Sequence, residues 1–342
     1  MATLYDLRHV EHHYDGAQVL GIDAWKIESD TVTGIVGPNG SGKSTLLSLL
    51  GLIVAPTRGE IRLNGRPAEP FCDRARGKVA LLPQNTFLLK RSVFRNIAYG
   101  LKIRKQISDT DRRVRSAMRM VGLDPDLFSQ RPWYALSGGE ARRVALASRL
   151  ALKPRVLLMD EPTTSVDTDS AQMIKTAALH ARRQWGTSLI ITSHDHQWLA
   201  DMCDQVLVMF RGTILGAGRH TLVFGPWHVP GDGGAEMPID EHQSFIAHSA
   251  PQDPDRSVAG IKVDQLHLFE QAGDASHARL HSLRGRLLQL GIENASDRIL
   301  ALVRVGSTDF HVYVPKRNDS PCRFEPGQTV WVGYDPAAVA WY

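Results

Sequence analysis

The alternation of apolar and polar residues divides the chain into a long first part and a shorter last part of different character. In the first part, four short apolar runs are typical of buried strands. These runs are Thr31–Val36, Lys78–Leu82, Arg155–Met159 and Ser188–Thr192. Helix-like segments separate the four runs, and this order predicts an α/β fold.

Smaller patterns add detail to this first part. Alternating runs in residues 2–30 lie on both sides of the turn Tyr14-Asp15-Gly16, and Glu60–Leu63 predicts a strand ending at Asn64-Gly65. Together they predict an antiparallel flap. Residues 92–130 are predicted to form helices with breaks near Ser108 and Asp124-Pro125. A further helix is predicted over 141–153, and an amphipathic helix is predicted to start at Asp167.

The last part of the chain lacks this alternation of strands and helices. Residues 225–256 are rich in Gly, Pro, Asp and His, a composition that predicts a linker. Short strands separated by turns follow, at 261–268, 284–292, 298–305, 310–314 and 329–334. This spacing predicts a small β-barrel. The expected domains are therefore residues 1–224, with a helical subdomain at about 88–153, and residues 257–342 after the linker.

Composition narrows the class of protein. The chain has 342 residues, which favours two domains, and its formal net charge is only +4. Its longest apolar stretch, Leu46–Ala55, is too short to cross a bilayer, and no secretory signal begins the chain. Three distant cysteines (Cys72, Cys203, Cys322) argue against a zinc site or a disulfide framework and suit a reducing cytosol.

Basic residues gather between Lys102 and Arg119. One interpretation is a solvated helix face. The other is a surface that lies near anionic lipid headgroups or nucleic acid.

The most informative stretch follows the first buried strand and fits the pattern G-x-x-x-x-G-K-[ST]. It consists of Gly37, Pro38, Asn39, Gly40, Ser41, Gly42, Lys43, Ser44 and Thr45. Glycines let backbone N–H groups converge on phosphates, and the next helix directs its positive end at them. Lys43 would then reach the β- and γ-phosphates of a nucleotide and Ser44 would bind Mg²⁺. A glycine-rich turn before a buried helix is the simpler alternative.

Polar residues stand at the ends of the other three buried strands, each with two interpretations. Gln84 can contact a metal or a water, or is a polar turn residue. Asp160 and Glu161 can hold Mg²⁺ and polarise a water, or are helix caps. His194 can donate to a phosphate, or lies on the surface.

Three further positions complete the set of candidates. Ser137 and Glu140 form a potential capping box, but Gly138 and Gly139 between them also allow an anion to approach the helix N–H groups. Tyr14 could stack on an adenine ring, or pack in the core of the flap. Asp167 is expected to cap the following helix.

In this order and spacing, these elements resemble the motif set of the ATP-binding cassette (ABC) ATPases over roughly residues 2–220. Leu136–Glu140 is the most specific element, because other phosphate-loop enzymes lack it. Two positions depart from the common pattern: Glu140 replaces the commoner glutamine, and Val166 stands where alanine or leucine is usual.

The resemblance implies roles by position. Tyr14 is similar to the adenine-stacking residue of the family. The 37–45 loop is similar to the segment that binds phosphate and Mg²⁺, with Lys43, Ser44 and Thr45 as the ligands. Gln84 resembles the glutamine that joins the metal to transporter contacts, Glu161 the catalytic base and His194 the switch histidine. Residues from Ser137 to Gly139 would bind the γ-phosphate held by a second copy of the chain.

The family also implies a fold and partners. We expect a phosphate-loop nucleoside triphosphatase core of the ABC type with an antiparallel β flap and a helical subdomain, followed by an OB-like accessory β-barrel. The expected cofactors are ATP and Mg²⁺. The expected partners are a second copy, a separate transmembrane permease and, indirectly, an extracytoplasmic solute-binding protein, with no nucleic acid. The protein would lie at the cytoplasmic face of the membrane.

Two classes of function fit such a chain: a transporter ATPase, or a soluble cassette protein that acts on ribosomes or DNA. A single cassette without a coiled-coil insertion favours the transporter. The C-terminal barrel resembles those of importer ATPases, which favours import over export. Tungstate or molybdate is the expected cargo, and sugars, polyamines, iron and sulfate are the alternatives.

Overall fold

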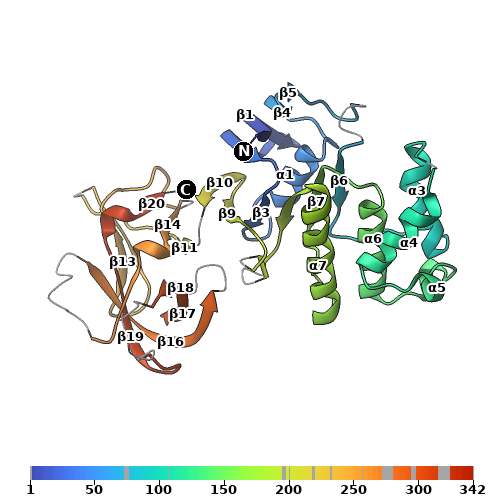
Figure 1. Ribbon diagram of the computed structural model, residues 1–342. Coiled ribbons are helices and arrows are strands. Elements are labelled where there is room, and N and C mark those ends of the chain that lie inside the picture. The colour runs from blue at the N-terminus through green and yellow to red at the C-terminus, as the bar shows by residue number, and fades with distance from the viewer. Residues whose placement is uncertain are drawn as a thin grey trace. The chain divides into compact units, whose positions relative to one another are not determined.

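The computed structural model describes residues 2–72, 77–106, 108–194, 198–199, 201–217, 220–231, 233–255, 257–271, 280–293, 298–314 and 324–341. Cys322 lies outside these ranges. The chain divides into two compact units, Met1–Gly216 and Ala217–Tyr342 (Figure 1).

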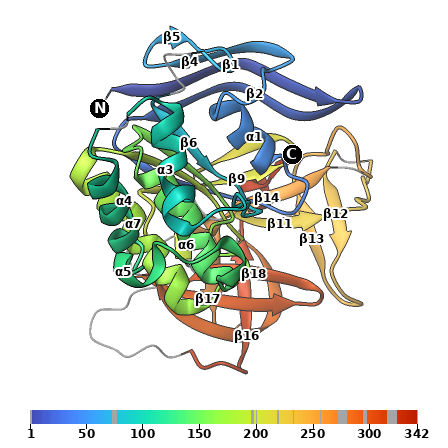
Figure 2. The same cartoon turned by 90° about the vertical axis from the view of Figure 1, so that its right-hand side faces the viewer.

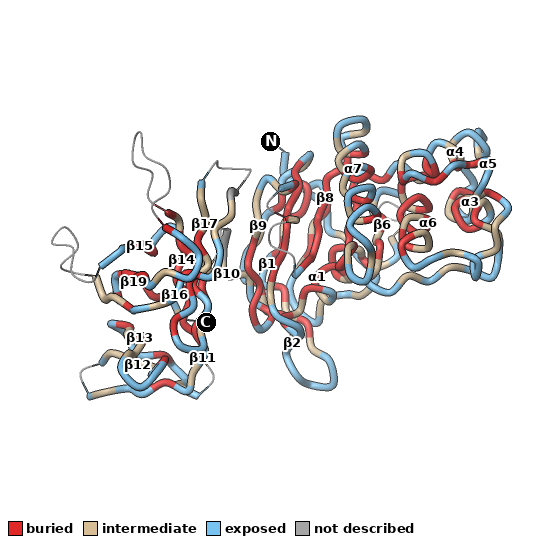
Figure 3. Tube along the Cα trace, turned by 90° about the horizontal axis from the view of Figure 1, so that it is seen from below, coloured by how far each residue is buried: buried red, intermediate tan, exposed pale blue. Residues whose placement is uncertain are grey.

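The first unit is organised around a six-stranded sheet with the strand order β10-β9-β3-β8-β7-β6. Its strands are β3 (Val32–Val36), β6 (Val79–Leu82), β7 (Val156–Asp160), β8 (Ser188–Thr192), β9 (Gln205–Phe210) and β10 (Thr213–Ala217). Strands β9, β3, β8, β7 and β6 run parallel to one another. All residues of β3, β7 and β8 are buried, which confirms the prediction of buried strands. Figure 3 shows this for β8. The carboxyl ends of β3, β8, β7 and β6 therefore meet at one edge of the sheet.

Helices accompany this sheet in the first unit. They are α1 (Lys43–Leu50), α3 (Val93–Ile103), α4 (Thr110–Met120), α5 (Pro125–Phe128), α6 (Gly138–Leu150) and α7 (Thr168–Trp185). Helices α3 and α4 both pack against α6. Ser92 and Asp124 cap α3 and α5 with their side chains, and α4 begins after Asp109. The predicted breaks near Ser108 and Asp124 are thus confirmed.

A second, antiparallel sheet forms the flap, with the strand order β2-β1-β4-β5. Its strands are β1 (Thr3–Tyr14), β2 (Ala17–Glu28), β4 (Arg58–Leu63) and β5 (Arg66–Pro67), and Figure 2 shows them above α1. Both predicted turns, Asp15-Gly16 and Asn64-Gly65, have positive φ at the two central residues. Two-residue hairpin turns of this kind need that geometry, which Asn, Asp and Gly adopt most readily. The predicted flap is confirmed.

The second unit contains a curled antiparallel sheet with the strand order β15-β19-β16-β17-β18. Its strands are β15 (His267–Phe269), β16 (His281–Glu293), β17 (Arg298–Val305), β18 (Thr308–Tyr313) and β19 (Thr329–Tyr334). The first half of β16 pairs with β19 and the second half with β17, so the long strand bends between two neighbours. The two edge strands β15 and β18 approach each other, and the resulting half-barrel fits the OB-like fold that was predicted.

The prediction that residues 225–256 form a linker was wrong. This segment contains β12 (Ala235–Pro238) and β13 (Ser244–Ala247), and it contributes to the same core as the half-barrel. Phe245 stacks on Tyr334 with ring centroids 4.6 Å apart, and Trp227 donates its indole N–H to the Ser257 carbonyl. Beside them lie β11 (His220–Phe224), β14 (Val258–Lys262) and β20 (Ala340–Trp341). The Gly and Pro residues separate short strands here, and the aromatic residues between them are buried.

The basic segment Lys102–Arg119 has many of its charges engaged within the first unit. Arg115 lies 2.7 Å from the Asp126 carboxylate, and Arg112 lies 2.7 Å from that of Asp109. Arg113 donates to the carbonyl of Ala151 at the end of α6. These contacts favour the interpretation as a solvated helix face. No helix in the described part of the chain is long and apolar enough to cross a membrane.

Candidate functional site

The shared edge of β3, β8, β7 and β6 gathers most of the residues that the sequence nominated. The glycine-rich loop follows β3, Asp160 ends β7, His194 follows β8 and Gln84 follows β6. Because these four strands are consecutive neighbours in the sheet, residues from distant parts of the sequence become neighbours at one edge.

The glycine-rich loop has the geometry of an anion cradle. Lys43 bends back over it, with Nζ donating to the carbonyls of Gly37 (2.8 Å) and Pro38 (3.0 Å). Gly42 caps α1 with a φ of 98°, no side chain caps that helix, and no acidic residue lies in its first turn. The first N–H groups of α1 are therefore not neutralised by the chain's own side chains, and the helix dipole favours an anion there.

Two further observations concern a polar atom of the loop and the packing of its backbone. The Ser41 hydroxyl is buried without a hydrogen-bond partner among the described residues, so it is a polar atom that a ligand could satisfy. A Cβ at Gly37 would lie 2.1 Å from the Met209 carbonyl, so only glycine allows the loop to pack this closely.

Charges of opposite sign surround Lys43. Burial lowers the pKa of Lys43, while the carboxylates of Glu161 and Asp160 act in the opposite direction. The loop after β3 and the end of β7 thus lie within electrostatic reach of each other. This arrangement places a cation and two carboxylates at the edge where a nucleotide's phosphates would bind.

Asp160 and Glu161 occupy different environments at the end of β7. Oδ1 of the buried Asp160 accepts a hydrogen bond from the Thr192 hydroxyl at 2.6 Å, which fixes its orientation. Asp160 and the exposed Ser44 offer only oxygen atoms, the donor type that Mg²⁺ prefers. The two residues fit a magnesium site by their chemistry.

Glu161 has an unusual backbone and a defined neighbour. Its φ is 45°, in the left-handed region that non-glycine residues seldom adopt. Its Oε1 lies 3.0 Å from Nε2 of His194, a close contact rather than an aligned hydrogen bond, while Oε2 accepts from the Thr164 hydroxyl and from the backbone N–H of His194. Glu161 and His194 also line one hollow together with Ser193. The sequence placed both residues at strand ends, and the structure brings them into contact.

Gln84 is exposed in the loop that follows β6, and the structure reveals a contact there that the sequence analysis missed. The guanidinium group of Arg142, in α6, donates to the Gln84 carbonyl. The same guanidinium reaches the carbonyls of Asp160 and Glu161. A signal existed in the sequence: Arg142 and Arg149 are spaced seven residues apart, so both lie on one face of the predicted helix.

The start of α6 lies apart from the glycine-rich loop. Ser137 and Glu140 form the capping box, with the Ser137 hydroxyl accepting from the Glu140 N–H and the Glu140 carboxylate from the Ser137 N–H. Asp167 caps α7 through the Ser170 N–H, as expected. Within the described part of the chain, no hydrogen bond or ion pair joins Ser137, Gly138 or Gly139 to the loop at 37–45.

Tyr14 lies at the end of β1 with 49% of its surface exposed, so it is not part of the flap core. Its ring meets the buried His12 ring edge to face, with centroids 4.7 Å apart. A half-exposed aromatic ring at this position is available to stack on a planar ring.

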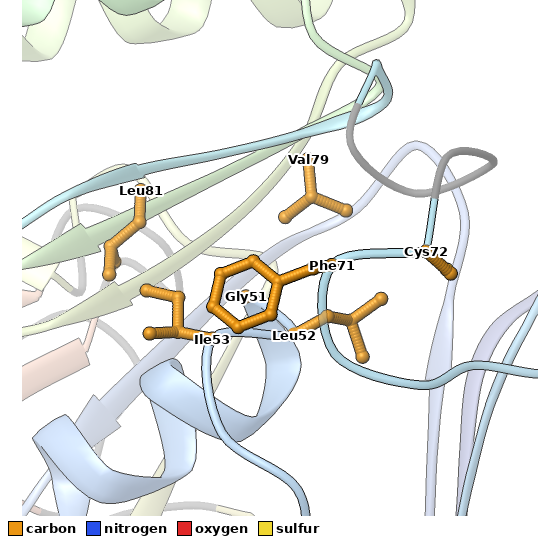
Figure 4. Close-up of a pocket in the computed structure, with 7 residues that line it drawn as sticks. All are labelled: Gly51, Leu52, Ile53, Phe71, Cys72, Val79 and Leu81. Carbon is orange, nitrogen blue, oxygen red and sulfur yellow. The ribbon is translucent and has the colours of Figure 1, made fainter.

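A separate apolar hollow lies at the other end of α1 (Figure 4). It is lined by Gly51, Leu52, Ile53, Phe71, Cys72, Val79 and Leu81. Because the glycine-rich loop ends in the first turn of α1 and this hollow begins after the last residue of the helix, the hollow is not part of the candidate nucleotide site.

Comparison with known proteins identifies the family. Residues 21–164 match the model of the ABC transporter family. The chain is 34% identical over 207 residues to the tungstate uptake system ATP-binding protein TupC of Peptoclostridium acidaminophilum, an alignment that covers 60% of this chain and 94% of that protein. The chain belongs to the ABC transporter ATP-binding family. Members of this family bind and hydrolyse ATP, and the resemblance stated above is confirmed.

Other family members have similar levels of identity. The molybdate/tungstate import ATP-binding protein WtpC of Archaeoglobus fulgidus is 39% identical over 186 residues, which cover 54% of this chain and 76% of that protein. Proteins named for the import of spermidine/putrescine (34%), methionine (32%) and phosphate (34%) also match. Identity at this level therefore does not separate one cargo from another.

The fold of the first unit has solved counterparts. The structure of cbiO1 from Clostridium perfringens, described as part of the ABC transporter complex cbiONQ, superposes with a TM-score of 0.57 at 28% identity. The superposition covers 64% of this chain and 89% of that one. This agreement confirms the ABC ATPase fold that was predicted.

Proposed function

We propose that this protein is the ATP-hydrolysing subunit of a membrane importer, with tungstate, molybdate or a similar oxyanion as cargo. The observation that carries the ATPase part is the gathering of the glycine-rich loop, Glu161 and His194 at one sheet edge. The proposal for the cargo is based on the relatives that are named for tungstate and molybdate import.

In this proposal ATP binds along the loop at 37–45, with its adenine on Tyr14. Lys43 turns from the loop carbonyls to the β- and γ-phosphates, exchanging neutral acceptors for charged ones. Ser44, Gln84 and Asp160 would hold Mg²⁺, which would supply positive charge next to the phosphates. The N–H groups at the start of α1 hold the phosphate oxygens in place.

Glu161 acts on the attacking water in this proposal. It accepts a proton as the water oxygen attacks the γ-phosphorus and the bond from that phosphorus to the ADP oxygen breaks. Glu161, with its left-handed backbone, lines the same hollow as His194. His194, already within 3.0 Å of the glutamate, is placed to donate to the γ-phosphate. Thr164 holds the second carboxylate oxygen and limits rotation of the side chain.

Two copies of the chain complete each site in this proposal. Gly138 has open space where a Cβ would be, with its nearest neighbour, the Ser165 carbonyl, 4.0 Å away. The start of α6 can therefore approach a phosphate, and the 37–45 loop that presents one belongs to the second copy. Asp167 stabilises the neighbouring start of α7.

The loop after Gln84 is the proposed contact with a separate permease, at the cytoplasmic face of the membrane. Phe87 is 80% exposed and Leu89 is 41% exposed, so the loop presents an apolar tip. Exposed apolar side chains of this kind suit a hydrophobic partner surface. A cysteine at Phe87 should form a crosslink to a cytoplasmic segment of the permease, and a cysteine at Phe71, which is exposed at the hollow that follows α1, is the control.

The cargo is tested by reconstituting the protein with its permease and solute-binding protein. The ATPase rate is then measured with tungstate, molybdate, sulfate, phosphate, methionine and spermidine. Stimulation by tungstate or molybdate at the lowest concentrations supports the proposal. Stimulation by spermidine or methionine alone contradicts the oxyanion cargo and leaves the ATPase function intact.

A further inference from the structure

One buried arginine connects three parts of the candidate site. Arg142, in α6, is only 3% exposed, although it carries a positive charge. Burying a charge is unfavourable unless hydrogen bonds satisfy the group. All the hydrogen bonds that the structure gives its guanidinium end on the two segments at the site edge.

The Nη1 atom of Arg142 faces the segment that follows β6. It donates to the carbonyl of Pro83 at 2.8 Å, to the carbonyl of Gln84, and to the hydroxyl of Thr86 at 3.1 Å. These three residues form the beginning of the loop whose tip is the exposed Phe87.

The other two nitrogen atoms of Arg142 face the end of β7. Nη2 donates to the carbonyls of Asp160 at 3.0 Å and Glu161 at 2.6 Å, and Nε donates to that of Pro162 at 3.2 Å. One planar group thus holds three consecutive carbonyls on one side and the loop on the other. Only a guanidinium offers five N–H donors in one rigid plane.

The hydrogen bond from Arg142 to the Glu161 carbonyl matters because the backbone of Glu161 is strained. A φ of 45° is unfavourable for a residue with a side chain, and it persists only where the surroundings enforce it. The Glu161 N–H is held by the carbonyl and the hydroxyl of Thr192, and the Glu161 carbonyl is held by Arg142. Thr192 and Arg142 together fix the peptide groups on both sides of the side chain.

The loop after β6 is held at both of its ends. Arg142 binds its beginning, and the buried Asn96 in α3 binds its end through the N–H and carbonyl of Leu89 and the carbonyl of Arg91. Phe87 lies between these two anchors and is exposed. A displacement of the loop therefore acts on residues that are themselves bonded to Arg142.

Arg149 adds a second connection on the same face of α6. Its Nε donates to the carbonyl of Leu81 in β6 at 3.0 Å, and burial lowers its pKa. Together with Arg142, it fixes the orientation of α6 against β6.

We propose that Arg142 is a positioning residue that joins the loop at Gln84 to the backbone of Glu161, so that movement of this loop changes the placement of the Glu161 carboxylate. The inference rests on the proposed function of Glu161 as the general base. Arg142 does not touch the nucleotide in this scheme. Its effect is on the rate of hydrolysis and not on the affinity for ATP.

The test compares three variants by ATPase kinetics of the full-length protein. Arg142→Gln removes the positive charge and replaces the planar group with five N–H donors by an amide with two. Arg142→Lys keeps the charge, but its single nitrogen atom cannot bridge the loop after β6 and the end of β7. Arg113→Gln is the matched control, because Arg113 also donates to backbone carbonyl oxygen of α6, at the Ala151 end away from the site. Thermal unfolding with and without ATP shows that each variant is folded.

We expect kcat to fall by about 10²-fold in Arg142→Gln, as a small misplacement of a catalytic group can cause, with KM for ATP changed by less than about threefold. Arg142→Lys should lose about 10-fold in kcat and decides the question if Arg142→Gln does not fold. Arg113→Gln should keep the kcat of the parent protein. The proposal is overturned if Arg142→Lys has the parent kcat, or if Arg113→Gln loses as much as Arg142→Lys.

A double variant separates this inference from the function on which it rests. If Arg142 acts through Glu161, Arg142→Lys should not lower the residual rate of Glu161→Gln any further. A further tenfold loss would show that Arg142 acts independently of Glu161, which contradicts the inference alone. Near-normal hydrolysis by Glu161→Gln itself would contradict the proposed function.

Discussion

Two helices of the first unit begin with glycine-rich sequences, and they begin in different ways. Helix α1 follows Gly42, whose left-handed backbone provides no side-chain cap, and its first turn contains no acidic residue. Helix α6 follows Ser137, whose side chain forms a complete capping box with Glu140. The first helix start is open to a ligand, and the second is satisfied by the chain itself.

A glycine-rich sequence before a helix therefore does not by itself make a strong anion site. At α1 the free N–H groups and Lys43 add their positive potential, so one chain can hold phosphates there. At α6 the carboxylate of Glu140 already occupies the positive end of the helix dipole. A phosphate at α6 needs to be held by other groups as well, which agrees with the proposal that a second copy presents it.

Of the changes at these two helix starts, the largest expected effect is at α1. Lys43→Ala removes the cation of the cradle and should weaken ATP binding by about 10- to 100-fold, the range expected for losing a charged hydrogen bond of about 1.5–3 kcal/mol. Isothermal titration calorimetry measures the change. Lys26→Ala, on the exposed face of β2, should bind ATP as the parent protein does. Equal affinity in Lys43→Ala would show that the cradle does not depend on its lysine.

The two glycines of α6 should respond differently to the same substitution. A Cβ at Gly139 would lie 2.6 Å from the Ser170 hydroxyl and 3.0 Å from Asp167 Oδ2, so Gly139→Ala should lower the free energy of unfolding by about 1–3 kcal/mol. Gly138→Ala meets open space and should keep the parent stability while it lowers ATP hydrolysis. Urea unfolding and ATPase assays check both. Normal hydrolysis by a stable Gly138→Ala variant would argue against a phosphate at this helix start.

The capping box itself should have a smaller effect. Ser137→Ala removes the acceptor for the Glu140 N–H and should cost about 1 kcal/mol of unfolding free energy. Ser92→Ala, which removes a cap of α3 outside the site, is the control and should cost a similar amount. Both are measured by urea unfolding. If Ser137 serves only as a cap, the two variants will retain equal ATPase rates, whereas a role at the phosphate lowers the rate of Ser137→Ala alone.

The smallest effect concerns Asp167, which caps the helix start adjoining α6. The backbone N–H of Ser170 and then its hydroxyl lower the pKa of the Asp167 carboxyl. A lowered pKa in the folded state means that the carboxylate stabilises the fold above the unfolded pKa of about 3.9 and that this contribution is lost as the pH falls through the folded value. Asp167→Asn should therefore be less stable than the parent at pH 7, with a smaller difference at pH 3. If urea unfolding gives the same difference in stability between the two proteins at pH 7 and at pH 3, the charge of Asp167 does not contribute to the stability of the fold.

The sequence predicted the first unit well because its elements are strongly patterned. Strands β3, β7 and β8 are largely apolar and are buried throughout, and β7 ends in Asp160, so both the burial of these strands and the placement of Asp160 at the sheet edge follow from the sequence. The turn at Asp15-Gly16 required residues that tolerate positive φ. In each of these cases, residues that are close together in the sequence were sufficient to predict the local structure.

In the second unit, residues that are close together in the sequence were not sufficient to predict the structure. Residues 225–256 have the composition of a linker, yet Trp227 and Phe245 lie in the core, because strands as short as β12 and β13 carry too little periodicity to be recognised. Arg142 was missed for a related reason. A charged residue in a helix is expected on the surface, and its carbonyl partners lie 18 to 59 residues away in the sequence.

The account depends most directly on Glu161, and one measurement tests it: the ATPase rate and ATP affinity of Glu161→Gln. The substitution keeps the size of the side chain and removes its ability to accept the proton. The account predicts that ATP still binds with the parent affinity while hydrolysis falls by about 10²- to 10⁴-fold. Hydrolysis close to the parent rate, with ATP bound normally, would contradict it.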